Sequence, residues 1–153
     1  MFLDGLMDRR FNIAVGKLLK NKMDEKFYVS LEVAKLLKEK GYNEKCTFAY
    51  TDISNGSDIN GRIVFNSNDY PVGIYPCPTK AEVIDWLESK GIVVELSYDN
   101  NLHKDCLRWD YYIYQHDNDG RSDEIVSSWE LCRFYNTRLE AEEAAIIDAL
   151  ENL

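Results

Sequence analysis

The sequence predicts an α+β fold, in which an antiparallel sheet carries helices packed on one face. The main observation is the order of elements in the second half, which reads helix, strand, strand, strand, helix. Both helices open with a capping box, formed by Thr79 with Glu82 and by Thr137 with Glu140. The runs between them alternate apolar and polar residues, which is the pattern of strands with one buried face.

The helix that opens at Thr79 is expected to stop at Gly91, because glycine readily adopts the left-handed conformation that ends a helix. Its apolar residues predict the core contacts Val83, Ile84, Trp86 and Leu87. The closing helix is expected to run from Thr137 to Leu153. Its predicted inner stripe consists of Leu139, Ile146, Leu150 and Leu153, thickened by Ala145 and Ala149.

Three strands are predicted between these helices, at residues 92–98, 107–115 and 127–135. The second strand should direct Trp109 and Tyr111 to the core and its alternate residues outward, among them Arg108, Tyr112 and Tyr114. The turn that follows it is predicted at Asp117 to Gly120. The third strand has two possible facings, with either Trp129 and Leu131 or Cys132 and Phe134 pointing inward.

The first half predicts a helix from Ser30 to Gly41, followed by strands at 46–51 and 62–66. Residues 52–61 contain two Asn-Gly dipeptides, which indicate a hairpin turn or loop. This half should therefore add a helix and a hairpin. Its helix shares the pattern E-V-x-x-x-L-x-x-K-G with the helix that opens at Thr79. Two explanations are open: both helices use the same favourable capping residues, or the two segments arose by internal duplication.

Residues 1–22 are predicted to form a helical N-terminal extension, because their apolar residues recur at helical spacing. They hold five basic and two acidic side chains, so the rest of the chain carries a charge of −12 within a total of −9. Met23 is a second possible start, and the sequence leaves the choice between Met1 and Met23 open. Residues 23–153 are expected to form a single α+β domain.

Composition argues against several classes of function. The net charge of −9 disfavours binding to phosphate backbones, so nucleic acid is an unlikely partner. No apolar run approaches the roughly 20 residues that cross a bilayer, and no signal peptide is recognisable, so a cytoplasmic protein that does not enter a membrane is expected.

No catalytic motif is present: the chain lacks a G-x-S-x-G elbow, a glycine-rich phosphate loop and a paired-carboxylate motif. The four cysteines, spaced about thirty residues apart, are expected to be small buried hydrophobic residues; a zinc site using His103 and Cys106 is a weaker alternative. Asp117 to Gly120 departs from the spacing of a calcium loop and favours a solvated turn. We therefore expect a protein that is not an enzyme, with no catalytic residues, cofactor or metal.

From Pro78 to Leu153 the order of elements resembles the double-stranded-RNA-binding domain. The closing helix, with Ala141-Glu142-Glu143-Ala144-Ala145, is the nearest match, and His103 falls near a histidine of that family. The resemblance implies the fold, and an RNA-binding function as the alternative. The start of the helix departs from the family's lysine cluster, because it offers Arg138 followed by glutamates that would repel phosphate.

Residues 27–153 also look similar to short uncharacterised proteins of phages and mobile elements in gut bacteria, chiefly in Phe27 to Tyr42 and in Trp109-Asp-Tyr-Tyr-Ile-Tyr114. This resemblance implies a non-catalytic accessory or protein-interaction protein. The stretch S-L-E-V-A-K-L-L from Ser30 resembles the first helix of excisionase-like DNA binders, but no basic second helix follows it.

The predicted partner-binding residues are Arg108, Tyr112 and Tyr114, on the sheet face opposite the helices. An exposed cluster of tyrosine and arginine is typical of protein interfaces, and its occupant would be a protein partner or a second copy of the chain. The alternative is that the N-terminal hairpin covers these rings and makes them part of the core.

Overall fold

The computed structural model describes residues 25–51, 62–99, 108–117 and 119–153. Within these ranges the chain is α+β, as predicted, and the helix-strand-strand-strand-helix order of the second half is present. The helices are η1 (Glu25–Phe27), α2 (Leu31–Glu39), α3 (Lys80–Ser89) and α4 (Arg138–Glu151). The strands are β1 (Cys46–Thr51), β2 (Arg62–Ser67), β3 (Ile74–Pro76), β4 (Ile92–Asp99), β5 (Arg108–His116) and β6 (Ser122–Ser127).

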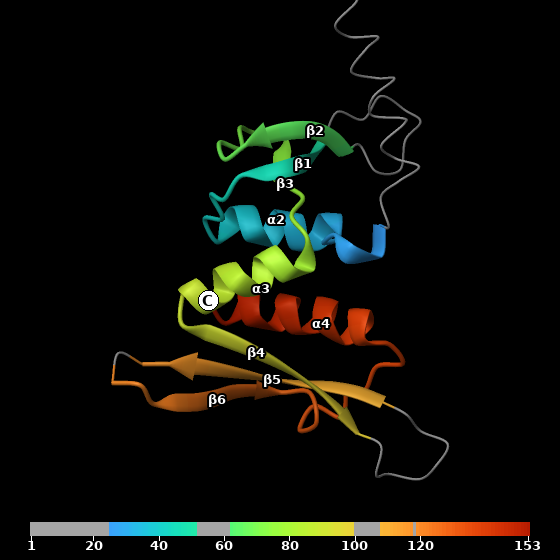
Figure 1. Ribbon diagram of the computed structural model, residues 1–153, viewed down its shortest axis with the longest axis vertical. Helices are drawn as coiled ribbons and strands as arrows, with labels where there is room; N and C mark the ends of the chain where they lie inside the picture. Colours follow the sequence, from blue (N-terminus) through green and yellow to red (C-terminus); the bar gives the residue numbers. More distant parts are fainter. Residues whose placement is uncertain (1–24, 52–61, 100–107, 118) are drawn as a thin grey trace, which may run out of the picture.

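The elements form layers, with helices between two antiparallel sheets (Figure 1). One sheet has the order β2-β1-β3 and lies against α2. The other has the order β4-β5-β6 and lies against α3 and α4. Helix α4 also contacts α2 and α3, so it joins the helices to one another as well as to the second sheet. The predicted sheet thus keeps its helices on one face, and the first half adds a second sheet rather than a hairpin alone.

A single hydrophobic core runs through the helical layer and both inner sheet faces. It includes residues from every helix predicted to have an apolar face, and its largest fully buried side chains are Tyr111, Leu37, Leu87, Ile92, Ile113, Ile146 and Leu150. The predicted stripes are confirmed for most positions. Ile84 and Leu139 are only half-buried, and Leu153 is exposed because α4 ends at Glu151, so the stripe does not reach the last residue.

The predicted helix signals are confirmed. The hydroxyl of Ser30 accepts a hydrogen bond from the Val33 N–H at the start of α2, and both predicted capping boxes are formed. Gly41 and Gly91 follow the ends of α2 and α3 with φ of +80° and +81°. This is the left-handed region that glycine adopts without steric cost.

The predicted third strand is wrong in position. The observed strand β6 is Ser122–Ser127, whereas residues 128–132 form a turn and only Tyr135 rejoins β5, in a bridge to Trp109. Ser127 opens the turn, because its hydroxyl accepts from the Glu130 N–H at 3.5 Å and its carbonyl accepts from the Leu131 N–H at 3.2 Å. Serine side chains that bond to nearby backbone favour turns over continued strands. Ser128 still contacts β5, where its hydroxyl accepts from the Tyr111 N–H at 2.9 Å.

The cysteine prediction holds for Cys46 and Cys77, which are buried, and fails for Cys132, which is exposed. Cys132 has a φ of +54° in the turn after β6, so the backbone there turns away from the sheet instead of carrying the side chain into the core. The extension at 1–22, the start at Met23, the loop at 52–61, His103 and Cys106 lie outside the described residues.

Candidate functional site

The predicted partner-binding residues lie on the outer face of the β4-β5-β6 sheet. Along β5, Tyr111 and Ile113 are buried against the helices, whereas Tyr112 and Tyr114 are half-buried on the opposite face. Cross-strand neighbours extend this face: Glu95 of β4 lies opposite Tyr112, and Glu124 of β6 lies opposite Tyr114. The alternation predicted for β5 is therefore present, but Trp109, predicted to reach the core, is half-buried and packs on Tyr98 instead.

Aromatic side chains continue the outer face beyond the strand β6. The guanidinium of Arg108 lies 5.2 Å from the centre of the Phe134 ring, and Trp129 packs edge-on against Phe134 at 5.3 Å. Phe134 precedes Tyr135, which stacks on the inward-facing Tyr111, so the two neighbours point to opposite sides of the sheet. Arg108 therefore contacts a pair of aromatic rings, Phe134 and Trp129, that the predicted site did not include.

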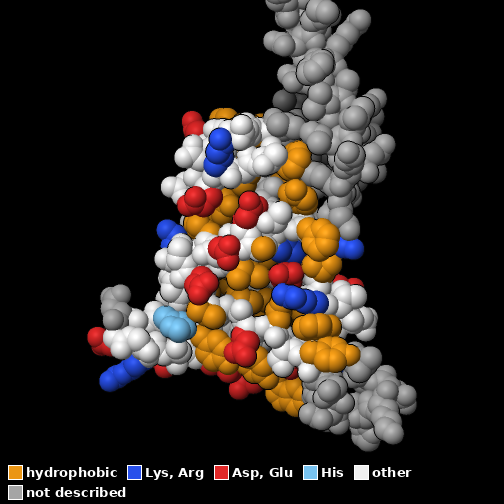
Figure 2. Space-filling view, in the orientation of Figure 1, with side chains coloured by type: hydrophobic (Ala, Val, Ile, Leu, Met, Phe, Trp, Pro, Cys, Tyr) orange, Lys and Arg blue, Asp and Glu red, His pale blue; other side chains and the backbone are white. Residues whose placement is uncertain are grey.

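The turn that interrupts the third strand also exposes apolar side chains. Trp129 and Leu131 are 45% and 48% exposed. Figure 2 views the layers from the side, and there hydrophobic side chains show between charged ones across the helical layer. Together we call Arg108, Tyr112, Tyr114, Trp129 and Phe134 the outer-face cluster.

Carboxylates surround the two tyrosines of this cluster. The pKa of Tyr112 is raised, first by partial burial and then by the negative charges of Asp110 and Glu124. The pKa of Tyr114 is raised by the same kinds of effect, with Glu95 and Glu124 as the neighbouring charges. Both hydroxyls therefore stay protonated at neutral pH and can donate hydrogen bonds.

Asp110 is the most unusual residue of the outer face. It alternates outward between Arg108 and Tyr112, yet it is only 4% exposed. Its Oδ1 atom accepts no hydrogen bond from any described residue. A buried carboxylate oxygen without a donor is costly, so Asp110 is a locally unfavourable feature of this sheet.

The described part of the N-terminal hairpin does not cover the outer-face cluster. Strands β1 and β2 lie on the far side of the helical layer from β4, β5 and β6 (Figure 1). Among the described residues, no helix or strand packs over the outer face of the second sheet.

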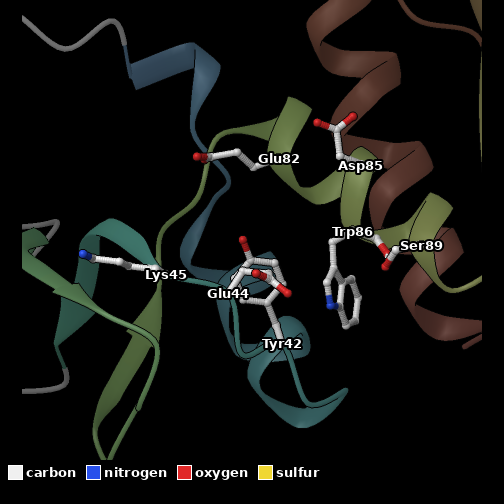
Figure 3. Close-up of a pocket in the computed structure, with 7 residues that line it drawn as sticks. All are labelled: Tyr42, Glu44, Lys45, Glu82, Asp85, Trp86 and Ser89. Atoms are coloured by element: carbon white, nitrogen blue, oxygen red, sulfur yellow. Dashed lines mark hydrogen bonds between the residues drawn. The ribbon is translucent and has the colours of Figure 1, made fainter.

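A groove of about 350 Å³ lies elsewhere, between the segment that follows α2 and the outer side of α3. Figure 3 shows the residues that line it: Tyr42, Glu44, Lys45, Glu82, Asp85, Trp86 and Ser89. The rings of Tyr42 and Trp86 meet at 5.3 Å and are almost wholly buried, whereas the charged residues are exposed at the rim.

Sequence patterns did not predict the groove, and they did not predict that Trp129 and Phe134 join the outer-face cluster. The groove residues come from two separate segments, and only tertiary packing brings them together. Trp129 and Phe134 were placed in a strand, although the Ser127-Ser128 pair before them is a turn signal.

Comparisons with protein-family models, with curated proteins and with solved structures found no match for this chain. The resemblances noted in the sequence therefore remain predictions. No described helix is both long enough and apolar enough to cross a bilayer. Within the described ranges, no three His, Cys, Asp or Glu residues are grouped so that they could hold a metal ion.

Proposed function

We propose that this protein is a non-catalytic accessory protein that binds a partner protein through the outer face of its β4-β5-β6 sheet. The observation that carries the proposal is the outer-face cluster, in which two half-buried tyrosines lie on the same face as an Arg108-Phe134-Trp129 stack. Tryptophan, tyrosine and arginine are the residues that most often dominate binding energy at protein interfaces.

The charges around the cluster favour a partner that presents lysine or arginine. Glu95 and Glu124 flank the tyrosines, and the chain as a whole carries a charge of −9. Opposite charges across an interface raise the association rate and select against other partners.

The proposal includes a role of the phage or mobile-element type, which rests on the resemblance of residues 27–153, and a cytoplasmic location. Cys46 and Cys132 carry thiols and form no disulfide, which is consistent with a reducing compartment.

The test replaces Tyr112 and Tyr114 together by serine and selects binders from a displayed library of random short peptides. We expect the free energy of unfolding to change by less than about 1 kcal/mol, because both rings are partly exposed. We expect the selected peptides to be rich in lysine and arginine and to lose about tenfold or more in affinity for the double variant.

Phe27→Ser is the matched control, because Phe27 is an exposed aromatic residue away from the second sheet. Its affinity for the selected peptides should equal that of the unchanged protein. Selection of acidic peptides, or equal binding by the double variant, would overturn the proposal. Unfolding of the double variant would show that the rings belong to the core.

A nucleic-acid-binding module is the second candidate, favoured by one observation: α3, β4, β5, β6 and α4 follow the order of the double-stranded-RNA-binding fold. At the start of α4, Arg138 and Glu140 are exposed with opposite charges, and Glu143 pairs with Lys80. We expect no binding to duplex RNA near physiological salt. A salt-sensitive complex tighter than about 10 µM would make this candidate the preferred one.

A further inference from the structure

The groove between the α2–β1 segment and α3 contains a hydrogen-bond donor that makes no bond with a described residue. Trp86 is only 4% exposed and contacts the rings and cations around it, yet its indole N–H donates no hydrogen bond to any described residue. In Figure 3 the indole nitrogen lies on the side of the ring that faces Tyr42 and Glu44. A nearly buried N–H that opens into a groove is a place for a ligand acceptor.

Tyr42 adds a second donor beside it. Its hydroxyl oxygen lies 3.9 Å from the Cys46 sulfur and makes no other side-chain hydrogen bond with a described residue. Burial, with Cys46 as the next cause, raises the pKa of Tyr42 far above its usual value. The hydroxyl therefore remains a donor at neutral pH.

The rim of the groove is negatively charged and so favours a cation, whereas the inner groups are hydrogen-bond donors and favour an acceptor. Glu44, Glu82 and Asp85 place three carboxylates there beside Lys45, and the ammonium of Lys90 lies 5.5 Å from the centre of the Trp86 ring. The Glu82 carboxylate is already used, because Oε2 accepts from the Thr79 N–H at 2.7 Å. Glu44 and Asp85 make no side-chain ion pair or hydrogen bond with a described residue, and both are exposed.

We propose that this groove binds a lysine or arginine residue of a peptide chain, with a peptide carbonyl at the Trp86 N–H and the cationic end at Glu44 and Asp85. The inner donors require an acceptor without negative charge, because an anion would face the carboxylates of the rim. An amide carbonyl meets this requirement, and a simple amine does not, because a protonated amine accepts no hydrogen bond.

The size of the groove agrees with one residue. Its volume of about 350 Å³ is at the small end of ligand sites, which span roughly 300–1,000 Å³. The groove lies on the helical layer, away from the outer face of the second sheet, so this inference goes beyond the proposed function and does not depend on it.

The test follows the indole N–H resonance of Trp86 by NMR in the full chain, with the resonance identified by its loss in Trp86→Phe. The probes are Nα-acetyl-lysine amide, Nα-acetyl-norleucine amide, which lacks the charge, and pentylammonium, which lacks the amide. We expect the lysine probe to shift the resonance saturably and to bind about fivefold more tightly than either other probe.

Glu44→Gln and Asp85→Asn should each weaken the lysine probe about threefold, and added salt should weaken it in the unchanged protein. Glu88→Gln is the control, because Glu88 is an exposed carboxylate of α3 that does not line the groove, and its affinity should stay unchanged. The inference is overturned if the Trp86 resonance does not move. Equal binding of pentylammonium, or equal weakening by Glu88→Gln, would overturn it as well, because either would indicate attraction to a negative surface only.

Discussion

The hydroxyl of Tyr111 donates a hydrogen bond to the carboxylate of Asp148, which connects the centre of the second sheet to α4. Arg133, from the segment after β6, lies 3.3 Å from the same carboxylate. Tyr111 is fully buried, so this bond is formed at the edge of the core and away from competing water. Three parts of the chain that are distant in sequence therefore meet at Asp148.

Replacing Tyr111 by phenylalanine should lower the free energy of unfolding by about 1.5–3 kcal/mol, the usual range for a hydrogen bond to a charged group. The ring stays in place, so the loss should come from the hydroxyl alone. Chemical denaturation measures the change. Tyr98→Phe is the control, since Tyr98 is an exposed tyrosine of the same sheet, and it should change stability by less than about 0.5 kcal/mol. Equal losses in both variants would contradict the expected role of Asp148.

Alkaline pH should destabilise the protein through its buried tyrosines. Burial and then Asp148 raise the pKa of Tyr111 above the ordinary value of about 10, and burial does the same for Tyr42 and Tyr70. Above that pH the unfolded chain loses these protons while the folded chain keeps them. Stability is therefore complete below about pH 10 and falls as pH rises, by about 1.4 kcal/mol per pH unit for each such group.

Denaturation at several pH values between neutral and alkaline checks this expectation. Tyr111→Phe should show a shallower fall than the unchanged protein, because one of the retained protons is absent. If the two proteins have the same slope above pH 10, Tyr111 does not contribute to the alkaline transition.

The two glycines that end α2 and α3 offer a matched pair of substitutions. Gly41 and Gly91 have nearly the same φ, but a Cβ at Gly91 would lie 3.1 Å from the His116 carbonyl oxygen, whereas a Cβ at Gly41 would meet nothing within 4 Å. Gly41→Ala should cost about 1–2 kcal/mol for the left-handed backbone. Gly91→Ala should cost about 1–3 kcal/mol more for the added crowding. Thermal or chemical unfolding that ranks them equally would show that the His116 backbone can move aside.

A second network ties the start of α3 to α4 and α2. Lys80 is buried, its Nζ lies 3.0 Å from Glu143 Oε2, and it donates to the Leu139 carbonyl at 3.2 Å. Glu143 Oε1 accepts from the Ser30 N–H at 3.1 Å. Glu143→Gln should cost about 2 kcal/mol, because Lys80 would keep its charge without a counterion.

The double variant Lys80→Met with Glu143→Gln should recover part of that loss, since no unpaired charge remains. Arg133→Met is the comparison, because Arg133 is more than half exposed in its pair with Asp148 and should cost less than about 1 kcal/mol. A double variant that is less stable than Glu143→Gln alone would show that the packing of the Lys80 chain matters more than its charge.

Much of the fold could be predicted because its signals are local. The capping boxes at Thr79 and Thr137, the glycines after α2 and α3, and the alternation along β5 each depend on residues close together in sequence. The end of β6 is marked locally only by the Ser127-Ser128 pair, which lies within an otherwise plausible apolar run, and the contact of Ser128 with Tyr111 of the neighbouring strand has no local signal.

The candidate sites also differ in whether their residues are related by a local sequence signal. Strand period alone places Tyr112 and Tyr114 on one face, so these residues could be identified from sequence. Trp129 and Phe134 join them only through the turn after β6. The groove combines Tyr42 with Trp86, and no pattern along the chain relates two positions that meet only when α2 and α3 pack.

The contacts of α4 also bear on how the protein forms during synthesis. This helix follows α2, α3, β4 and β5 in the chain and packs against all four. Until α4 has left the ribosome, the parts of the second sheet and of the other helices that pack against α4 remain uncovered. Exposed apolar surface of this kind promotes aggregation of nascent chains. The β1-β2 hairpin can pair earlier, but the common core should close only as a late, cooperative step.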